Sequence, residues 1–193
     1  DDVVSRYGQV DTVLAAAGVS SSGYISGEVS EVEAEPEERM FHNRTLEDWE
    51  KVMAVNVTGV MLTNQMAIKH MLAKGNAGSI VNIASIAGRR PLPGASDYCV
   101  SKAAVIMLTQ TVATEYSTSN IRINAIGPGF IETPMTANIR QSPEWMDTVM
   151  QMTPMQRMGQ ANEIASTALF LASDESSYFT GQTLFPNGGM FTG

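Results

Sequence analysis

The sequence predicts an α/β fold in which helices cover both faces of a parallel sheet, the doubly wound arrangement. Compact apolar runs alternate with longer helical patterns along the chain. The runs lack polar and apolar alternation, as is typical of strands buried on both faces. The chain has 193 residues, of which 44% are hydrophobic and 17% charged, so one domain over residues 1–193 is expected.

The expected elements follow in order. A short helical pattern at 3–7 ends at Gly8, and the apolar run at 11–17 is expected to be the first strand. Thr45, which precedes acidic residues, has the form of a helix N-cap. The remaining expected elements are helix 45–73, strand 78–84, helix 96–115, strand 120–126, helix 161–173 and strand 182–185. This alternation is typical of a parallel, doubly wound sheet.

An acidic loop insertion at residues 20–44 interrupts the pattern. Six glutamates lie within eleven positions of it: Glu28, Glu31, Glu33, Glu35, Glu37 and Glu38. Carboxylates at this density repel one another and favour water, which predicts a solvated loop. A flap beside a binding site is the alternative.

Composition excludes several classes of protein. Lys and Arg number 12 and Asp and Glu 20, a net charge of −8, whereas nucleic-acid binders carry the opposite sign. A single cysteine, Cys99, forms no internal disulfide, and the two histidines have no cluster of ligands beside them, so no metal site is expected. No apolar run approaches the roughly 20 residues of a membrane span, and no leader opens the chain. We therefore expect a cytoplasmic protein without a nucleic-acid or membrane partner.

Three polar residues lie at or near the ends of the expected strands, where open α/β sheets bind ligands. Ser85 follows the strand at 78–84, while Tyr98 and Lys102 are four residues apart on the helix at 96–115 and share one face. An ammonium beside a phenol lowers the pKa of the tyrosine from its usual value of about 10. Such a tyrosine can exchange a proton with a substrate oxygen, to which Ser85 can also donate. Alone, a Tyr–Lys pair at this spacing is more often a surface contact.

A glycine-rich turn follows the strand at 120–126. Residues 127–133 read Gly-Pro-Gly-Phe-Ile-Glu-Thr, and glycines at the carboxyl end of a strand let the backbone approach a ligand closely. Its peptide groups can pair with a carboxamide.

Together these motifs resemble the short-chain dehydrogenase/reductase family, most closely its 3-oxoacyl-[acyl-carrier-protein] reductases. The matching segments are Val-Asn-Val-Thr-Gly at 55–59, Ile-Ala-Ser-Ile-Ala-Gly at 83–88, Tyr-Cys-Val-Ser-Lys at 98–102, Asn-Ala-Ile-Gly-Pro-Gly-Phe-Ile-Glu-Thr-Pro-Met at 124–135, and the ending at 170–189. They occur in the family's order and spacing. The resemblance implies a Rossmann-like fold.

The resemblance also implies a role for each matching residue. Tyr98 would be the general acid/base, Ser85 would orient the substrate carbonyl, and Lys102 would lower the pKa of Tyr98 and hold the nicotinamide ribose. Asn56 would anchor a water that relays protons to Lys102, and a buried structural amide is the alternative. The further positions implied for cofactor binding are Ala15, Gly18, Pro128, Gly129, Ile131 and Thr133. Thr133 could instead cap the next helix.

The sequence departs from the family pattern at two places. The family's Asn-Asn-Ala-Gly reads Ala-Ala-Ala-Gly at 15–18, and no Thr-Gly-x-x-x-Gly-x-Gly turn occurs in these 193 residues. We expect the fold to be N-terminally incomplete by two βα units, about 60–70 residues. The strand at 11–17 would then be an unpaired edge. Because the residues that select NAD or NADP belong to the missing units, the preference is not readable.

The predicted function is that of an NAD(P)-dependent oxidoreductase that interconverts a secondary alcohol and a ketone. A 3-oxoacyl thioester is the substrate that the resemblance implies. The alternative is a truncated or degenerate family member that acts without catalysis, as a scaffold or oligomer partner. Relatives pair through their long helices and through the last strand, and the helices here carry more apolar surface than one sheet face covers, so a homodimer or homotetramer is expected.

The stretch from Pro134 to Met158 is rich in methionine. Six of the chain's 13 methionines lie there: Met135, Met146, Met150, Met152, Met155 and Met158. By resemblance this stretch is the flap over the substrate, where flexible thioethers suit an apolar ligand. Ordinary filling of the core is the alternative.

Overall fold

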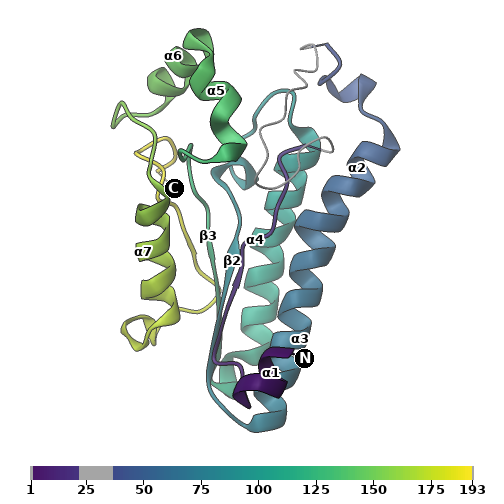
Figure 1. The fold of residues 1–193 in the computed structure, drawn as a ribbon, viewed down its shortest axis with the longest axis vertical. Coiled ribbons are helices and arrows are strands. Elements are labelled where there is room, and N and C mark those ends of the chain that lie inside the picture. The colour runs from purple at the N-terminus through teal and green to yellow at the C-terminus, as the bar shows by residue number, and fades with distance from the viewer. Residues whose placement is uncertain (1, 22–36, 193) are drawn as a thin grey trace.

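The computed structural model describes residues 2–21 and 37–192, which form a three-layer α/β fold (Figure 1). Four parallel strands of these residues make one sheet in the order β1-β2-β3-β4. The strands are β1 (Thr12–Ala15), β2 (Gly78–Ile83), β3 (Ile121–Ile126) and β4 (Thr183–Leu184). Neighbours in the sequence are therefore neighbours in the sheet, and each pair is joined by a crossover connection.

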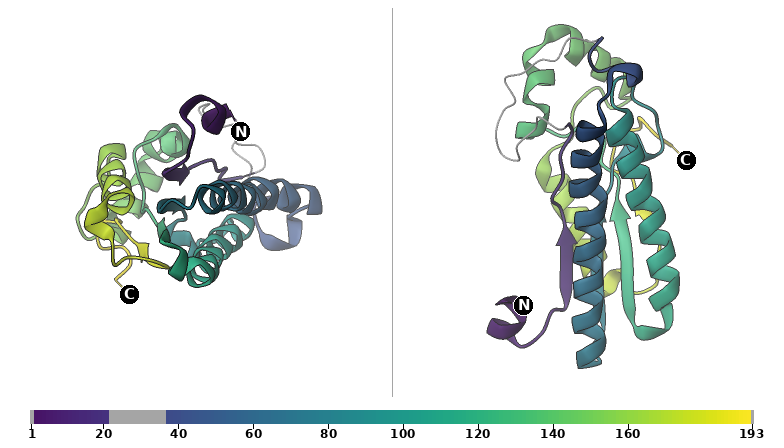
Figure 2. Two further views of the ribbon diagram at one scale, coloured as in Figure 1. Left: turned by 90° about the horizontal axis from the view of Figure 1, so that it is seen from below. Right: turned by 90° about the vertical axis from the view of Figure 1, so that its right-hand side faces the viewer.

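Helices cover both faces of the sheet, as the sequence predicts. Helices α3 (Gly59–Lys74) and α4 (Ser96–Tyr116) lie on one face and α7 (Ala161–Ala172) on the other (Figure 2). Ile80 of β2 packs into the core beneath α3 and α4, while the next residue, Val81, packs against α7. Successive side chains of a strand point to opposite faces, so one apolar run supplies both cores.

The predicted helix at 45–73 consists of three parts. Helix α2 (Leu46–Met53) passes through a π-helical turn, η2 (Ala54–Thr58), into α3. Thr45 is the N-cap, as predicted, and its Oγ1 accepts a hydrogen bond from Asp48 N at 3.1 Å. The π-helical turn was not predicted, because apolar periodicity does not reveal a one-residue change of hydrogen-bond register.

Strand β1 forms one edge of the sheet, which agrees with the expected unpaired edge. It is shorter than the predicted 11–17, and Leu14 is 50% exposed. Burial on both faces, which its apolar run predicted, is therefore wrong for β1 and correct for the inner strands. The short helix α1 (Asp2–Tyr7) precedes it and contains no buried residue.

Short helices rise above the carboxyl end of the sheet between β3 and α7 (Figure 1). They are η5 (Pro134–Thr136), α5 (Ala137–Gln141) and α6 (Pro143–Met152). Ser142 caps α6, because its side chain accepts a hydrogen bond from Trp145 N at 3.4 Å. Of the acidic loop predicted at 20–44, residues 22–36 lie outside the described residues, and the described end contains η1 (Phe41–Asn43).

None of the helices in the described ranges is both long and apolar enough to cross a membrane. Within the same ranges, no three or more His, Cys, Asp or Glu side chains gather as a set that could hold a metal ion.

Candidate active site

Ser85 stands at the carboxyl end of β2, where it begins the 3₁₀ turn η3 (Ile86–Gly88). Its Oγ accepts a hydrogen bond from Ala87 N at 3.1 Å, and Ile86 N donates to Pro128 O at 3.0 Å. Ser85 is 8% exposed. These bonds fix the serine beside the glycine-rich turn that follows β3, where the sequence placed the site.

Tyr98 lies in the first turn of α4, and its hydroxyl forms a hydrogen bond with the Ser85 side chain. The ring is partly exposed, but the hydroxyl is enclosed. Burial raises the pKa of Tyr98 above its usual value, and the bond with Ser85 offsets this in part. Lys102 is not among the groups that shift this pKa, so the expectation that Lys102 lowers the pKa of Tyr98 stays a prediction, and burial keeps the phenol protonated.

Lys102 lies one helical turn beyond Tyr98 and on the same face, as predicted. Its Nζ is 5.6 Å from the centroid of the Tyr98 ring and donates to Ile83 O at 2.9 Å. Burial lowers the pKa of Lys102 to about 8. An ammonium has three donors, and Ile83 takes one of them within the described part of the chain, so two remain for a ligand.

Asn56 is fully buried in the π-helical turn, and protein groups occupy its side chain. Oδ1 accepts from Val19 N at 2.8 Å, while Nδ2 donates to Val19 O at 2.9 Å and to Ser101 Oγ at 3.0 Å. The Asn56 side chain is therefore a buried structural amide, the alternative that the sequence left open. A water relay from Asn56 to Lys102 stays a prediction, and it would have to use the Asn56 backbone.

Gly18 lies between Asn56 and Lys102. A Cβ at this position would be 3.3 Å from Asn56 Oδ1 and 3.3 Å from Lys102 Nζ. The missing side chain leaves space beside the ammonium. Ala15, by contrast, is buried in a core cluster with residues of α3, α4 and β3, so only its backbone could face a cofactor.

The turn after β3 is held by the segment that follows β4. Gly129 N donates to Pro186 O at 3.1 Å, and a Cβ on Gly129 would lie 2.8 Å from Asn187 Cα. Residue 129 must therefore be a glycine for the two backbones to approach. The same turn carries Pro128, whose carbonyl binds the Ser85 loop, so the structure brings this part of the predicted site together.

Ile131 and Thr133 lie further along, where the chain enters the short helices above the sheet. Ile131 pairs with Gly159 in an isolated β-bridge and lines a cavity of about 170 Å³. Thr133 is the N-cap of η5, the alternative that the sequence left open. No hydrogen bond joins either residue to Ser85 or Tyr98 within the described residues, so their contact with a cofactor stays a prediction.

Sequence reasoning missed Ser101 and the Ile83 carbonyl. Ser101 is fully buried, accepts a hydrogen bond from Asn56 and donates to Tyr98 O at 2.7 Å. It stands three residues after Tyr98, a spacing that could have placed it on the same helix face. Ile83 binds Lys102 through a backbone carbonyl, for which a sequence carries no signal.

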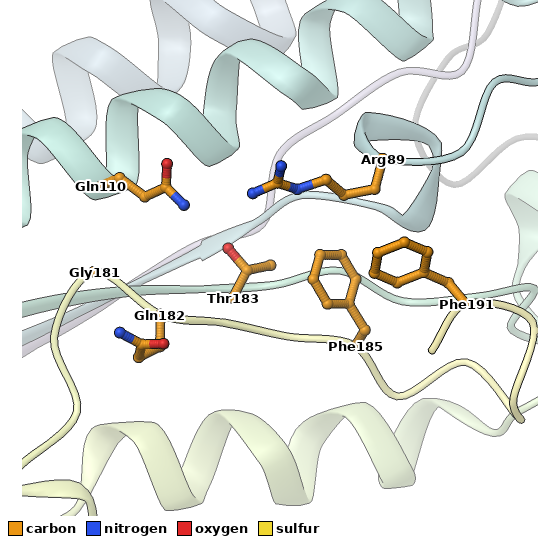
Figure 3. A pocket seen from close by; sticks show the side chains of 7 residues that line it. All are labelled: Arg89, Gln110, Gly181, Gln182, Thr183, Phe185 and Phe191. Carbon is orange, nitrogen blue, oxygen red and sulfur yellow. The ribbon is translucent and has the colours of Figure 1, made fainter. Parts of the chain in front are cut away.

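A groove of about 310 Å³ lies apart from this site, between α4 and β4 (Figure 3). It is lined by Arg89, Gln110, Gly181, Gln182, Thr183, Phe185 and Phe191. The rings of Phe185 and Phe191 meet edge to face, with centroids 4.9 Å apart. None of the sequence-predicted site residues lines the groove, so it is not part of the candidate active site.

Comparison with known proteins places the chain in a family. The family model described as Enoyl-(Acyl carrier protein) reductase matches residues 1–191. The 3-oxoacyl-[acyl-carrier-protein] reductase FabG of Thermotoga maritima is 40% identical over 190 residues, 98% of this chain and 70% of that protein. The 3beta-hydroxysteroid dehydrogenase 1 of Eggerthella lenta is 40% identical over 190 residues, 97% and 71% of the two chains.

The fold matches solved structures as well. A gluconate 5-dehydrogenase from Burkholderia cenocepacia, in complex with NADP and tartrate, aligns with a TM-score of 0.86 at 30% identity and covers 98% of this chain and 68% of that chain. The sequence match over nearly the whole chain and the shared fold lead to one conclusion: the chain belongs to the short-chain dehydrogenase/reductase family.

Proposed function

We propose that this chain is an NAD(P)-dependent oxidoreductase that interconverts a ketone and a secondary alcohol at Tyr98. The observation that carries the proposal is the hydrogen bond between the Tyr98 and Ser85 hydroxyls, with the Lys102 ammonium beside the same ring. A proton donor, an orienting hydroxyl and a buried cation thus meet at the carboxyl edge of the sheet. The related dehydrogenases and reductases, including the structure that contains NADP, support this function.

The residues present fit the nicotinamide end of such a cofactor. Lys102 has donors left for ribose hydroxyls, and the absent side chain of Gly18 leaves room beside them. When bound, NAD or NADP supplies or accepts the hydride. The described residues support neither of the two cofactors over the other.

The chain's own residues handle the proton. In the reducing direction Ser85 donates a hydrogen bond to the substrate carbonyl oxygen and so orients it. The protonated Tyr98, whose pKa burial raises, gives its proton to the same oxygen as negative charge develops there. Lys102 then stabilises the phenolate that remains, because its cation lies beside the ring. Oxidation of the alcohol reverses these steps.

A 3-oxoacyl thioester is the substrate class that we favour. It is supported by the 40% identity to a 3-oxoacyl-[acyl-carrier-protein] reductase. The methionine-rich segment that carries α5 and α6 is consistent with an apolar acyl chain, because both helices lie above the carboxyl end of the sheet and Trp145 of this segment is 53% and Met155 60% exposed. Because the chain is also 40% identical to a 3beta-hydroxysteroid dehydrogenase, a ring ketone is the second substrate to compare in the assay.

The experiment compares ketone-dependent oxidation of NADPH and of NADH by the unsubstituted chain, by Tyr98→Phe and by Tyr178→Phe. We expect Tyr98→Phe to lose about 100- to 10,000-fold in kcat while its thermal midpoint is unchanged, since it lacks the proton donor. Tyr178 is fully exposed, so Tyr178→Phe is the matched control and keeps full activity. An active Tyr98→Phe enzyme would contradict the mechanism. Absence of turnover in the unsubstituted chain, despite a folded state, would support the non-catalytic scaffold, the alternative that Ala15, Ala16 and the missing glycine turn favour.

Self-association of this chain through α3 and α4 is part of the proposal. Apolar side chains along their outer faces are more than one-third exposed: Met61, Leu62, Met66, Leu72, Val100 and Met107. Burial of these exposed apolar side chains between copies of the chain favours a homodimer or homotetramer. Light scattering of the eluting protein tests this, and replacement of Leu62 and Met107 by glutamate is expected to give monomers.

A further inference from the structure

A buried ion pair lies beside the first turn of α4 and has no part in the chemistry described above. The carboxylate belongs to Asp97, the residue before Tyr98, and its side chain is 1% exposed. Asp97 Oδ2 lies 3.5 Å from Nη1 of Arg44, whose side chain is 12% exposed. Arg44 directly follows η1, so the pair joins two distant parts of the chain.

Arg44 also binds two backbone carbonyls. Its Nη2 donates to Gly94 O at 2.9 Å and to Arg39 O at 3.2 Å. Gly94, with φ of 77°, lies near the end of the loop that connects the Ser85 turn to α4. One guanidinium thus holds the segment at 39–44, this loop and the start of α4 together.

Asp97 in turn holds the backbone of Tyr98. Its Oδ1 accepts a hydrogen bond from Tyr98 N at 2.8 Å. Amides in the first turn of a helix have no partner within the helix, so this bond helps to fix how the chain enters α4. Asp97 Oδ2 accepts no hydrogen bond from the described residues, which leaves Arg44 to balance a buried charge. An unbalanced buried carboxylate is costly.

We infer that the Arg44–Asp97 pair positions Tyr98 against Ser85, an inference that rests on the proposed function. Arg44 and Asp97 are positioning residues, because they act through the Tyr98 backbone. Without the guanidinium, the carboxylate turns toward water and the first turn of α4 moves with it. A displacement of about 1 Å at a reacting group costs about 100-fold in rate. The effect therefore falls on kcat, while the space beside Lys102 and Gly18 is retained.

The test measures kcat and the KM for NADPH in Arg44→Met, Asp97→Asn and the double variant. Arg44→Met is expected to lower kcat about 10- to 100-fold and to change KM less than about threefold. In the double variant no charge needs balancing, and the Asn amide oxygen still accepts from Tyr98 N. It is therefore expected to recover to within about fivefold of the unsubstituted kcat. Arg6→Met is the matched control, because Arg6 is exposed on α1, where its guanidinium lies over the Tyr7 ring.

Two results would overturn the inference: an unchanged kcat in Arg44→Met, or a double variant no more active than Arg44→Met. If Arg44→Met does not fold, the double variant still tests the inference. A kcat near that of the unsubstituted chain supports it, because the double variant leaves no unbalanced charge. A low kcat in the double variant contradicts it.

A second measurement does not depend on activity. Hydrogen exchange of the backbone at 95–101 is expected to be at least about tenfold faster in Arg44→Met and to slow again in the double variant. If the unsubstituted chain turns over no ketone, the proposed function fails, and this exchange pattern alone decides the positioning. If the chain is active and exchange at 95–101 is the same in all variants, the positioning inference fails and the function stands.

Discussion

Gly18 and Lys102 share one small space, because a Cβ on residue 18 would lie 3.3 Å from Lys102 Nζ. Lys102 is 4% exposed and its ammonium is bound to Ile83 O, so the ammonium moves away from the added methyl only by giving up that bond or its position beside Tyr98. Gly18→Ala is therefore expected to lower kcat/KM for NADPH about 10-fold, by crowding the donors that a ribose would use.

The measurement is steady-state turnover at varied NADPH, with Gly8→Ala as the contrast. Gly8 has no atom within 4 Å of its added Cβ, and its φ of 84° makes the substitution a test of backbone strain alone. We expect Gly8→Ala to lower the thermal midpoint and leave kcat/KM unchanged. Equal kcat/KM values for Gly18→Ala and the unsubstituted chain would show that the space is not needed.

Lys102 is expected to lower the free energy of unfolding, although the proposed function needs it. Burial lowers its pKa from 10.5 to about 8, so the folded chain carries an unfavourable buried ammonium at neutral pH. Lys102→Met should raise the free energy of unfolding at pH 7 by up to about 3 kcal/mol and abolish turnover.

The lowered pKa of Lys102 also predicts how the difference in the free energy of unfolding between Lys102→Met and the unsubstituted chain changes with pH. Between pH 8 and pH 10.5 the unfolded chain holds a proton on Lys102 that the folded chain has lost, so the unsubstituted chain gains stability as pH rises. Denaturant unfolding of both chains at pH 7, 9 and 10.5 should show the advantage of Lys102→Met shrinking. An advantage that stays constant over this range would contradict the lowered pKa.

Sequence patterns predicted the site well where side chains carry the information. The spacing of Tyr98 and Lys102 placed them on one face of α4, and the run before Ser85 placed it at the end of β2. The burial that raises the pKa of Tyr98 was not predicted, because the sequence shows neighbouring residues but not how deeply the hydroxyl is buried. The Arg44–Asp97 pair was not predicted either, since long-range pairing leaves no local pattern.

The same distinction applies to the fold. Inner strands β2 and β3 and helices α4 and α7 agree with the predicted ranges to within one residue, because periodicity and caps define them. The π-helical turn was missed, because its backbone follows tertiary contacts, such as the bonds of Asn56 to Val19, that no local propensity encodes. Helices α5 and α6 were not predicted either, although Ser142 and Pro143 are a local helix-start signal for α6.

Asn82 joins β2 to both helices on one face of the sheet and is predicted to be important for stability. Asn64 Nδ2 donates to Asn82 Oδ1 at 2.8 Å, and Asn82 Nδ2 donates to Thr109 Oγ1 at 3.0 Å. Each of these three residues is 2% exposed or less. Asn82→Leu removes the bonds to both partners and leaves Asn64 Oδ1 without its donor in the core, although Asn64 Nδ2 and Thr109 Oγ1 keep their bonds to backbone carbonyls. It should lower the free energy of unfolding by about 2–4 kcal/mol. Thr63→Val, on an exposed part of α3, should change it by less than about 0.5 kcal/mol. Chemical denaturation measures both, and similar values for the two variants would contradict the prediction.

Glu163 and Arg157 form a two-pronged ion pair at the start of α7. Arg157 Nη2 lies 2.6 Å from Glu163 Oε1, and Nη1 lies 2.9 Å from Oε2, which also accepts from Gln160 N. Chiefly because of the Arg157 hydrogen bonds, the pKa of Glu163 falls to about 2. The pair therefore contributes stability above the carboxyl's usual pKa of 4.5, and this contribution is lost as pH falls toward 2.

Thermal midpoints of the unsubstituted chain and of Glu163→Gln from pH 7 to pH 2 test this. We expect Glu163→Gln to unfold at a lower temperature above pH 4.5 and the two midpoints to converge as Glu163 takes up its proton. Because the pair is exposed, the difference should be small and should shrink in 1 M salt. Glu144→Gln, in the first turn of α6, removes a carboxylate that has no ion pair among the described residues. A pH-independent difference for Glu163→Gln would mean that the glutamate contributes through its fit at the α7 cap and not through its charge.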